Sequence, residues 1–239
     1  MNDARPWPAL VAASVLTTVC AVAAGVSAGA AGSELSRGPS TAELHSAARR
    51  EVAERWRTWA SGRIFPASVA YSAEQGGQER ASRVGISPLT ACAGSVDAKA
   101  AKALRKARCR AVLRATYIDA LRGVLVTVGV VALPDELEAV RAKSAFPLGG
   151  APVPGLRPLA FQDTVSDRFQ ASVRQAGSVR QAGPYLVLTT AGQVDGRPAK
   201  AVGEQRPAIF AFATEISERI LADLSTPRMP DCSSSEWRC

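Results

Sequence analysis

The chain has 239 residues, of which 47% are hydrophobic and 21% charged, and these proportions exclude a disordered or low-complexity protein. The length fits one domain of roughly 180–200 residues with terminal extensions. The single histidine, His45, excludes a metal site built from several histidines, and its place in a helical pattern argues against a Ser-His-Asp triad. The net charge of +8 favours anionic partners such as lipid head groups or cell-wall polymers, although an arginine-rich genome would produce the same excess.

The N-terminal segment is apolar. After a short start over residues 1–6, residues 7–31 carry no charged side chain. About 20 apolar residues in a helix cross a bilayer, so this segment predicts a transmembrane anchor, with the start in the cytoplasm and the rest of the chain outside. A cleaved signal peptide, which would leave the protein secreted, is the alternative, because Val26-Ser27-Ala28 and Ala28-Gly29-Ala30 have the small residues of a cleavage site. We favour the anchor because the apolar run exceeds the usual signal-peptide core of about 7–15 residues.

Small side chains recur every four residues along this segment, at Ala13, Thr17, Ala21, Gly25 and Gly29. Such a stripe lets two helices approach closely and would support a homodimer, although alanine is common enough here for the stripe to arise by chance. Residues 25–29 also match the G-x-S-x-G nucleophile elbow. They lack the preceding strand and the partner histidine that the elbow needs, so the match predicts no catalytic serine.

The exported domain is expected over residues 41–224, after a linker over residues 32–40. Ser40 and Glu43 have the spacing of a capping box and open a helix that stops at Gly62. Residues 63–72 then indicate an extended segment, with a return strand further along the chain.

The next predicted helix, residues 97–108, is the most basic stretch of the chain. Its cations and two on the following strand are the candidate contacts for an anionic surface: Lys99, Lys102, Arg105, Lys106, Arg108, Arg110 and Arg114. A solvated helix face is the alternative interpretation. Because no aromatic residues interleave with these cations, we expect no nucleic-acid partner.

Four cysteines follow the N-terminal segment: Cys92, Cys109, Cys232 and Cys239. An even number of cysteines in an exported domain is typical of disulfides. We favour the pairs 92–109 and 232–239 because each joins sequence neighbours. The spacing contains no C-x-x-C, which argues against zinc, and we expect no cofactor.

Residues 109–133 form the centre of the predicted fold, as two strands joined by a turn at 119–123. Gly123 is expected to supply the positive φ of that turn. The first strand alternates with a period of two, which implies one packed and one partly wet face. The second strand, 124–133, is apolar on both faces and therefore central in the sheet.

The second half of the domain begins with a helix from Pro134 to about Ala145, in which Leu137 and Val140 are expected to face inward. Residues 146–158 are rich in Pro and Gly and predict a loop or an inter-lobe linker, followed by an edge strand at 159–162.

A perfect tandem repeat, SVRQAG, occupies residues 172–177 and 178–183. Two copies are too few for a solenoid and indicate an insertion that lengthens a surface loop. A strand over 185–194 and a helix over 207–224 complete the domain, and residues 225–239 form a Pro/Ser-rich tail.

The outline combines a short start, an anchor and the stretches RWRTWASGRIFPASVAY, CRAVLRATYIDALRGVLVTVGVVALP and GPYLVLTTAGQVDGR. It resembles the membrane-anchored exported proteins of unknown function found in actinobacteria, over roughly residues 41–224. More distantly, the domain is similar to extracytoplasmic sensor domains of actinobacterial kinases and to bitopic accessory subunits of secretion or conjugation machines. None of these resemblances implies functional residues.

The elements predict an α+β fold, with a mainly antiparallel sheet and helices packed on it, preceded by one N-terminal transmembrane helix. We expect a non-enzymatic cell-envelope ectodomain that binds a partner protein or an envelope ligand. An accessory bitopic subunit of a secretion or transport complex is the alternative. A cell-wall hydrolase is the least favoured function, because no catalytic motif is present.

Overall fold

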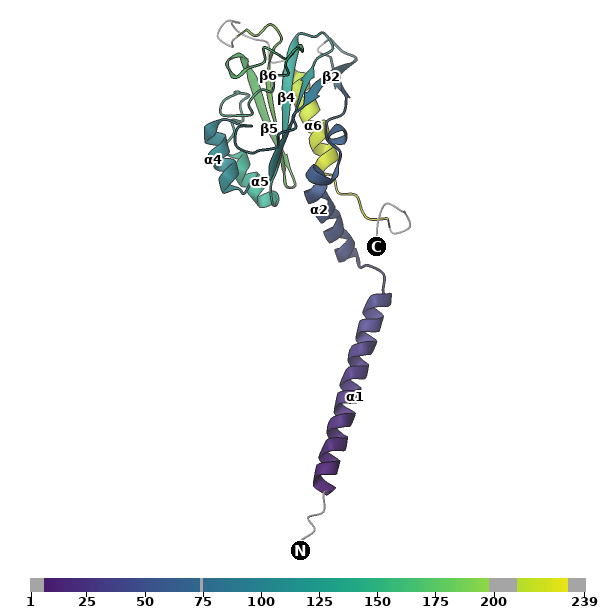
Figure 1. Ribbon diagram of the computed structural model, residues 1–239. Coiled ribbons are helices and arrows are strands. Elements are labelled where there is room, and N and C mark those ends of the chain that lie inside the picture. The colour runs from purple at the N-terminus through teal and green to yellow at the C-terminus, as the bar shows by residue number, and fades with distance from the viewer. Residues whose placement is uncertain (1–6, 74, 198–209, 232–239) are drawn as a thin grey trace. The chain divides into compact units, whose positions relative to one another are not determined.

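The computed structural model describes residues 7–73, 75–197 and 210–231 (Figure 1). The chain divides into two compact units. One comprises residues 1–45 and 230–239, and the other comprises residues 46–229.

The first unit contains the apolar helix α1, Trp7–Ser36. Its stretch Val11–Gly29 is long and apolar enough to cross a membrane, as an anchor or as a signal sequence. The hydroxyls of Thr17 and Thr18 donate to the carbonyls of Ala13 and Ser14, four residues earlier. Such bonds satisfy polar side chains within the helix itself, which suits an apolar surrounding. Because α1 continues to Ser36, the irregular connection to the next helix is limited to residues 37–40.

Helix α2, Thr41–Thr58, begins with the capping box expected from the sequence. The Ser40 N–H donates to Glu43 Oε2 at 2.8 Å, and the Glu43 N–H donates to Ser40 Oγ at 3.4 Å. Arg37 adds an ion pair to the same carboxylate at 2.8 Å. Hydrogen bonds from Arg37 and Ser40 hold the pKa of Glu43 far below its ordinary value. Reciprocal bonding of this kind satisfies N–H groups that a helix start leaves free.

The second unit is built on a six-stranded antiparallel sheet with the order β1-β2-β3-β4-β6-β5. Its strands are β1 Ser68–Ser72, β2 Gln78–Ile86, β3 Ala111–Ile118, β4 Val124–Ala132, β5 Ala176–Ala182 and β6 Tyr185–Gln193. The α+β class and the antiparallel sheet are therefore confirmed.

The hairpin β3–β4 lies in the middle of the sheet, with Ala111 opposite Ala132 and Ile118 opposite Leu125. In its turn, Asp119 Oδ1 accepts hydrogen bonds from the N–H groups of Gly123 and Val124 at 2.7 and 2.8 Å. The positive φ expected at Gly123 falls at Arg122 instead, with a value of 57°. The Asp119 carboxylate organises the end of the turn, so Gly123 need not adopt the left-handed conformation.

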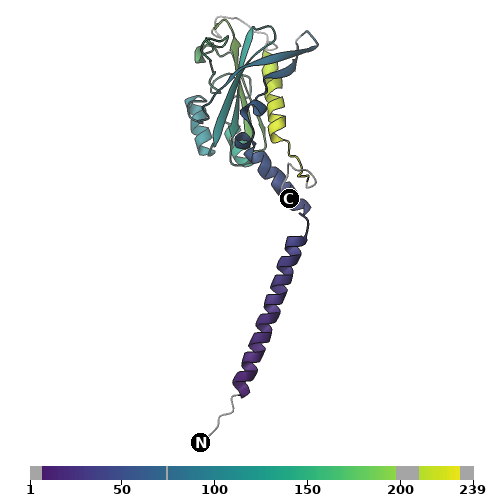
Figure 2. The same ribbon diagram turned by 45° about the vertical axis from the view of Figure 1, so that its right-hand side comes forward.

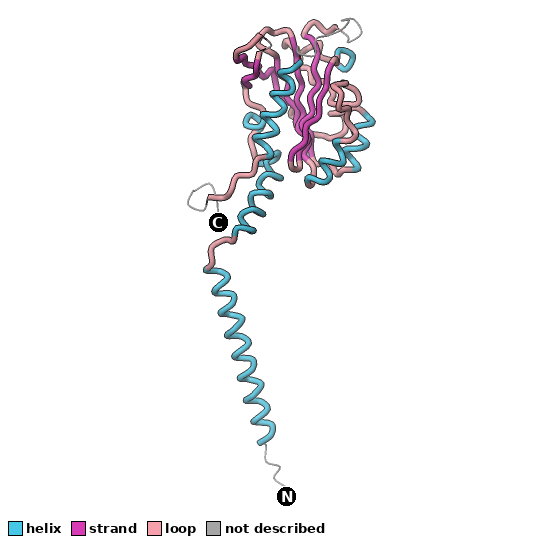
Figure 3. The backbone as a smooth tube through the Cα atoms, turned by 180° about the vertical axis from the view of Figure 1, so that it is seen from behind, coloured by secondary structure: helices cyan, strands magenta, loops and turns pink. Residues whose placement is uncertain are grey.

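Helices cover both faces of the sheet (Figures 1 and 2). On one face α2 and α6, Ala211–Ser225, share a core with the sheet. On the other face α4, Ala98–Lys106, and α5, Glu136–Lys143, pack in a second core. The view from behind shows the strands between these helices (Figure 3). The short helices α3, Ser61–Ile64, and η1, Ala171–Val173, complete the described elements.

The central strands are buried on both faces. Every residue of β4 is buried, as the sequence predicted. The expectation of a partly wet face for β3 is wrong, since Arg114 is only 9% exposed and Thr116 is fully buried. The period of two identifies the two faces of a strand, but it does not show what lies over each of them.

Residues 149–161, here called the crossing segment, run across the α4 face of the sheet. The sheet offers them a row of small or hydroxylated residues in register, one from each of five strands: Gly85, Thr116, Thr127, Thr190 and Gly177. The Leu159 N–H donates to Thr127 Oγ1, and its carbonyl accepts from Thr116 Oγ1. The sequence predicted a loop or an inter-lobe linker over residues 146–158, and the structure has a loop there that packs on the sheet, whereas the edge strand expected at 159–162 does not form. The crossing segment packs over the sheet because glycines leave room for it.

Two further expectations are corrected in the second half of the domain. Leu137 and Val140 of α5 are 59% and 50% exposed, and Ala139 and Ala142 are buried instead. Small side chains let this helix approach the sheet closely. The tandem repeat supplies the edge strand β5 rather than a longer surface loop. An edge position tolerates added residues because only one neighbouring strand has to pair with them.

Candidate anion-binding surface

Helix α4 presents four cations to solvent: Lys99, Lys102, Arg105 and Lys106. Buried Ala100 and Leu104 hold the opposite side of the helix against the sheet. The three lysines follow one another at intervals of three and four residues, which places them on one side of the helix. No acidic side chain among the described residues forms an ion pair with these four cations, which are called the α4 surface below.

A disulfide closes the segment that contains α4. Cys92 and Cys109 are bonded, with their Cα atoms 6.4 Å apart and a sequence separation of 17. This is the pairing expected from the sequence. The bridge ties both ends of the segment together, which limits how far α4 can move from the start of β3. Cys232 and Cys239, the other expected pair, lie outside the described residues.

Two of the candidate cations are already paired. Arg108 Nη2 lies 3.5 Å from Glu138 Oε1 and 3.8 Å from Asp135 Oδ2. Arg110 Nη1 lies 3.6 Å from Glu54 Oε1. Exposed pairs of this kind stabilise a fold little, but they neutralise the local charge. The structure therefore separates both arginines from the α4 surface.

Arg114, the last candidate, is not on the surface. It is only 9% exposed, and it belongs to the face of β3 that the crossing segment covers. The expectation that it extends an exposed patch is wrong, because the crossing segment packs over this face of β3.

The position of α4 depends on an ion pair that sequence reasoning missed. Asp97, the residue before the helix, accepts hydrogen bonds at 2.8 Å from Arg174 Nη1 and from the Gly155 N–H. Arg174 Nη1 also donates to the carbonyls of Pro152 and Leu156. Burial alone would raise the pKa of Asp97, but these hydrogen bonds outweigh it and hold the pKa below its ordinary value. Asp97 and Arg174 thus join α4, the crossing segment and the start of β5.

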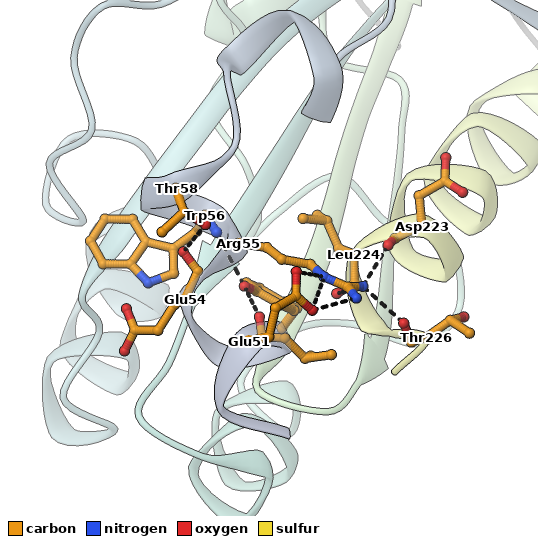
Figure 4. A network of polar contacts seen from close by, with 10 residues as sticks. Glu51, Glu54, Arg55, Trp56, Thr58, Asp223, Leu224 and Thr226 are labelled. Carbon is orange, nitrogen blue, oxygen red and sulfur yellow. Dashed lines mark hydrogen bonds and ion pairs between the residues drawn. The ribbon is translucent and has the colours of Figure 1, made fainter. Parts of the chain in front are cut away.

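A second buried arginine joins α2 to the end of α6 (Figure 4). Arg55 is fully buried, and its Nη1 donates to the carbonyls of Asp223, Leu224 and Thr226 at 2.9–3.0 Å. Its Nε donates to both carboxylate oxygens of Glu51. Nη2 lies 2.6 Å from Glu51 but makes no well-directed hydrogen bond, so the pairing acts mainly through Nε. A cation at the carboxyl end of a helix complements its unpaired carbonyl groups.

Two of the three buried tyrosines donate hydrogen bonds to backbone carbonyl groups. The Tyr185 hydroxyl donates to the Val52 carbonyl at 2.6 Å, and the Tyr117 hydroxyl donates to the Pro66 carbonyl at 2.9 Å. Burial raises the pKa of Tyr185 to about 12 and that of Tyr117 higher still, so both remain protonated at neutral pH. Each joins a strand to the segment that packs over it.

One hollow of about 330 Å³ lies at the edge of the sheet, between β5, Gly149, Gly150 and the first turn of α6. The described residues that line it include no charged side chain. The Ser178 and Thr189 hydroxyls there bond each other at 2.7 Å. Within the described ranges, no three His, Cys, Asp or Glu side chains gather closely enough to hold a metal ion.

Comparison with known proteins adds nothing to this geometry, because no protein-family model, no curated protein and no solved structure matches the chain.

Proposed function

We propose that this chain is a non-enzymatic ectodomain of the cell envelope that binds an anionic envelope polymer through the α4 surface. The observation that carries the proposal is the set of four exposed cations on one helix without acidic partners among the described residues. A cluster of unpaired cations attracts polyanions over distances up to the Debye length, about 10 Å at 0.1 M salt.

Rigidity supports this proposal. The disulfide closes the segment around α4, and Asp97 fixes the start of the helix through Arg174 and Gly155. A helix held at both ends loses little further backbone entropy when a ligand binds its cations. The apolar helix α1 supports a place at the membrane, as an anchor or before cleavage as a signal sequence.

The test compares two variants with the same loss of charge. One replaces Lys99, Lys102, Arg105 and Lys106 with Gln, and the control replaces four exposed arginines elsewhere in the chain, Arg49, Arg50, Arg219 and Arg228, with Gln. The full chain, in discs of zwitterionic lipid, is titrated with a soluble poly(glycerol phosphate). At roughly 1 kcal/mol per cation near an anionic surface, the loss of four cations should weaken binding by the first variant about 1,000-fold. Equal losses of affinity in both variants would show that net charge alone causes the binding, and this result would contradict the proposal.

A partner protein is the second candidate, and α5 favours it. Leu137 and Val140 lie three residues apart, and their side chains are 59% and 50% exposed. Replacing both with Ser should abolish crosslinks to a partner captured from intact envelopes, and it should leave polyanion binding unchanged. Crosslinking that persists in this variant would exclude α5 as the docking element.

A further inference from the structure

The hollow at the edge of the sheet is large enough to hold a small molecule. Its volume of about 330 Å³ lies at the lower end of the range of roughly 300–1,000 Å³ that ligand pockets occupy. Small side chains on both sides leave this space open: Ala176 and Ala191 on the strands, and Ala211 and Ala213 on α6. Ala211 is exposed, so a ligand can enter from solvent. The hollow therefore suits a ligand with a single ring.

The wall of this hollow is polar but carries no charge among the described residues. Its polar side chains are the hydroxyls of Ser178, Thr189 and Thr214 and the amide of Gln175. An ionised ligand would lose part of its hydration here without meeting a counter-charge, which is unfavourable. A neutral ligand avoids that cost and can still form hydrogen bonds. The lining therefore selects a neutral and polar molecule.

Hydroxyl groups on both sides of the hollow are available to such a ligand. Ser178 and Thr189 share one hydrogen bond of 2.7 Å. Because each hydroxyl carries one hydrogen, one of the two O–H groups is left without an acceptor among the described residues. Thr189 is only 3% exposed, so bulk water reaches it poorly. On the α6 side, the Thr214 hydroxyl forms no hydrogen bond with any residue that the structure describes.

We propose that this hollow binds a neutral monosaccharide. The hydroxyls of a sugar ring both donate and accept hydrogen bonds, as do those of Ser178, Thr189 and Thr214. The C–H groups of the sugar can contact the ring of Phe210, which also lines the hollow. The site lies on the α6 side of the sheet, whereas α4 packs on the opposite face. It therefore goes beyond the proposed function and can hold or fail independently of it.

The test is ligand-observed saturation-transfer NMR on the full chain in discs of zwitterionic lipid, titrated with D-glucose, D-galactose and D-mannose. Ser178→Ala combined with Thr189→Val removes both strand hydroxyls, and Ala211→Trp fills the hollow from its exposed side. The matched control combines Ser172→Ala with Thr190→Val. Ser172 is exposed and lies outside the hollow, and Thr190 is on the opposite face of β6, where its hydroxyl has no hydrogen bond to lose.

We expect saturable binding of at least one of these sugars. Its affinity should be at least about tenfold weaker without the two strand hydroxyls, undetectable in A211W and unchanged in the control. Glucuronate has the ring of glucose with a carboxylate added, and it should bind more weakly than glucose. All of these variants should bind poly(glycerol phosphate) as the wild type does, so failure of the proposed function would be recognised separately.

Absence of saturable binding of all three neutral sugars by the wild type would overturn the proposal. Equal weakening in the control would also overturn it, and so would tighter binding of glucuronate than of glucose. Because Ala211 is exposed, A211W keeps the test decisive if the variant without the strand hydroxyls does not fold. Undiminished sugar binding by A211W would place the sugar outside the hollow.

Discussion

At the residue scale, three of the arginines that the structure describes are buried, and they differ in whether their charge has a partner. Arg55 and Arg174 each have a carboxylate and several carbonyl groups as partners, whereas Arg114 has neither. The local sequence does not predict this difference. Arg174 and Arg180 occupy the same place in the two copies of SVRQAG, yet Arg174 is buried against Asp97 and Arg180 forms an exposed pair with Glu218. No local pattern distinguishes two identical hexamers, so this ion pair could not be predicted.

Arg55 provides the sharpest stability prediction. Arg55→Met should lower the free energy of unfolding by about 3–5 kcal/mol, because it leaves the Glu51 carboxylate and three carbonyl groups at the end of α6 without their donor. Urea unfolding followed by tryptophan fluorescence measures the loss. The control is Arg57→Met, which breaks only the more exposed pair with Glu54 and should cost about 1 kcal/mol or less. Similar losses in both variants would refute the role given to Arg55.

Asp97 predicts a dependence of stability on pH. Its folded-state pKa lies below the ordinary value of 3.8, so the carboxylate stabilises the fold fully above pH 3.8 and loses that contribution as the pH falls through the folded-state pKa. Asp97→Asn should therefore be less stable than the wild type at neutral pH, and the difference should shrink below pH 3.8. Urea unfolding at a series of pH values measures it. In an Arg174→Gln background the same substitution should have a smaller effect, and an unchanged effect would contradict the pairing.

At the element scale, the crossing segment packs against the sheet where two strands have a glycine instead of a larger side chain. Added Cβ atoms at Gly85 and Gly129 would lie 2.6 Å from Phe161 and 2.5 Å from Leu156. Such glycines look like weak points in a strand when only the strand is considered. Residues 146–158 likewise look like a linker, since their Pro and Gly content shows only that they form no regular element. The reason for the glycines in the strands becomes clear only from the contacts that the crossing segment makes with them.

Gly129→Ala tests this packing. The added methyl group meets Leu156, which is buried and has little room to move, so the variant should lose about 1–3 kcal/mol of unfolding free energy. Gly123→Ala is the matched control. Gly123 lies directly before β4, and no atom lies within 4 Å of a Cβ added there. The substitution should therefore be neutral or slightly stabilising. Equal stability of the two variants in thermal unfolding would show that the crossing segment is not closely packed.

At the scale of the whole molecule, the apolar helix α1 and the domain differ in the exposure of their apolar side chains. The side chains described over Val11–Gly29 are exposed, whereas the central strands of the second unit are buried on both faces. A long exposed apolar surface is unfavourable in water and suits a bilayer. The sequence alone predicted this division, because both length and composition of the segment can be read directly.

The anchor is tested by extracting membranes at alkaline pH. A retained helix keeps the chain in the membrane pellet. Replacing Leu16 and Val19 with Arg should release it, since each charge at the centre of a bilayer costs about 2.5–3.5 kcal/mol. Leu89→Arg, at an exposed position of the domain, should leave the chain in the pellet. A mature protein that starts near Gly29 or Ala31 in the culture supernatant would identify the segment as a cleaved signal peptide.

The sequence by itself determined the fold class and most of the helices and strands. Periodicity and capping residues identified the central hairpin, the capping box at Ser40 and an antiparallel α+β fold, because these properties depend on neighbours within a few residues. It also supported the pairing of Cys92 with Cys109, which are close along the chain.

Only the tertiary structure decided which cations remain available to a ligand. The sequence grouped Arg108, Arg110 and Arg114 with the lysines of α4, but ion pairs neutralise the first two and the crossing segment covers the third. Burial and pairing depend on residues such as Glu54 and Leu156, which lie far away in the chain. Because the availability of a charged side chain depends on the groups that surround it in space, it can be judged only once the chain is folded.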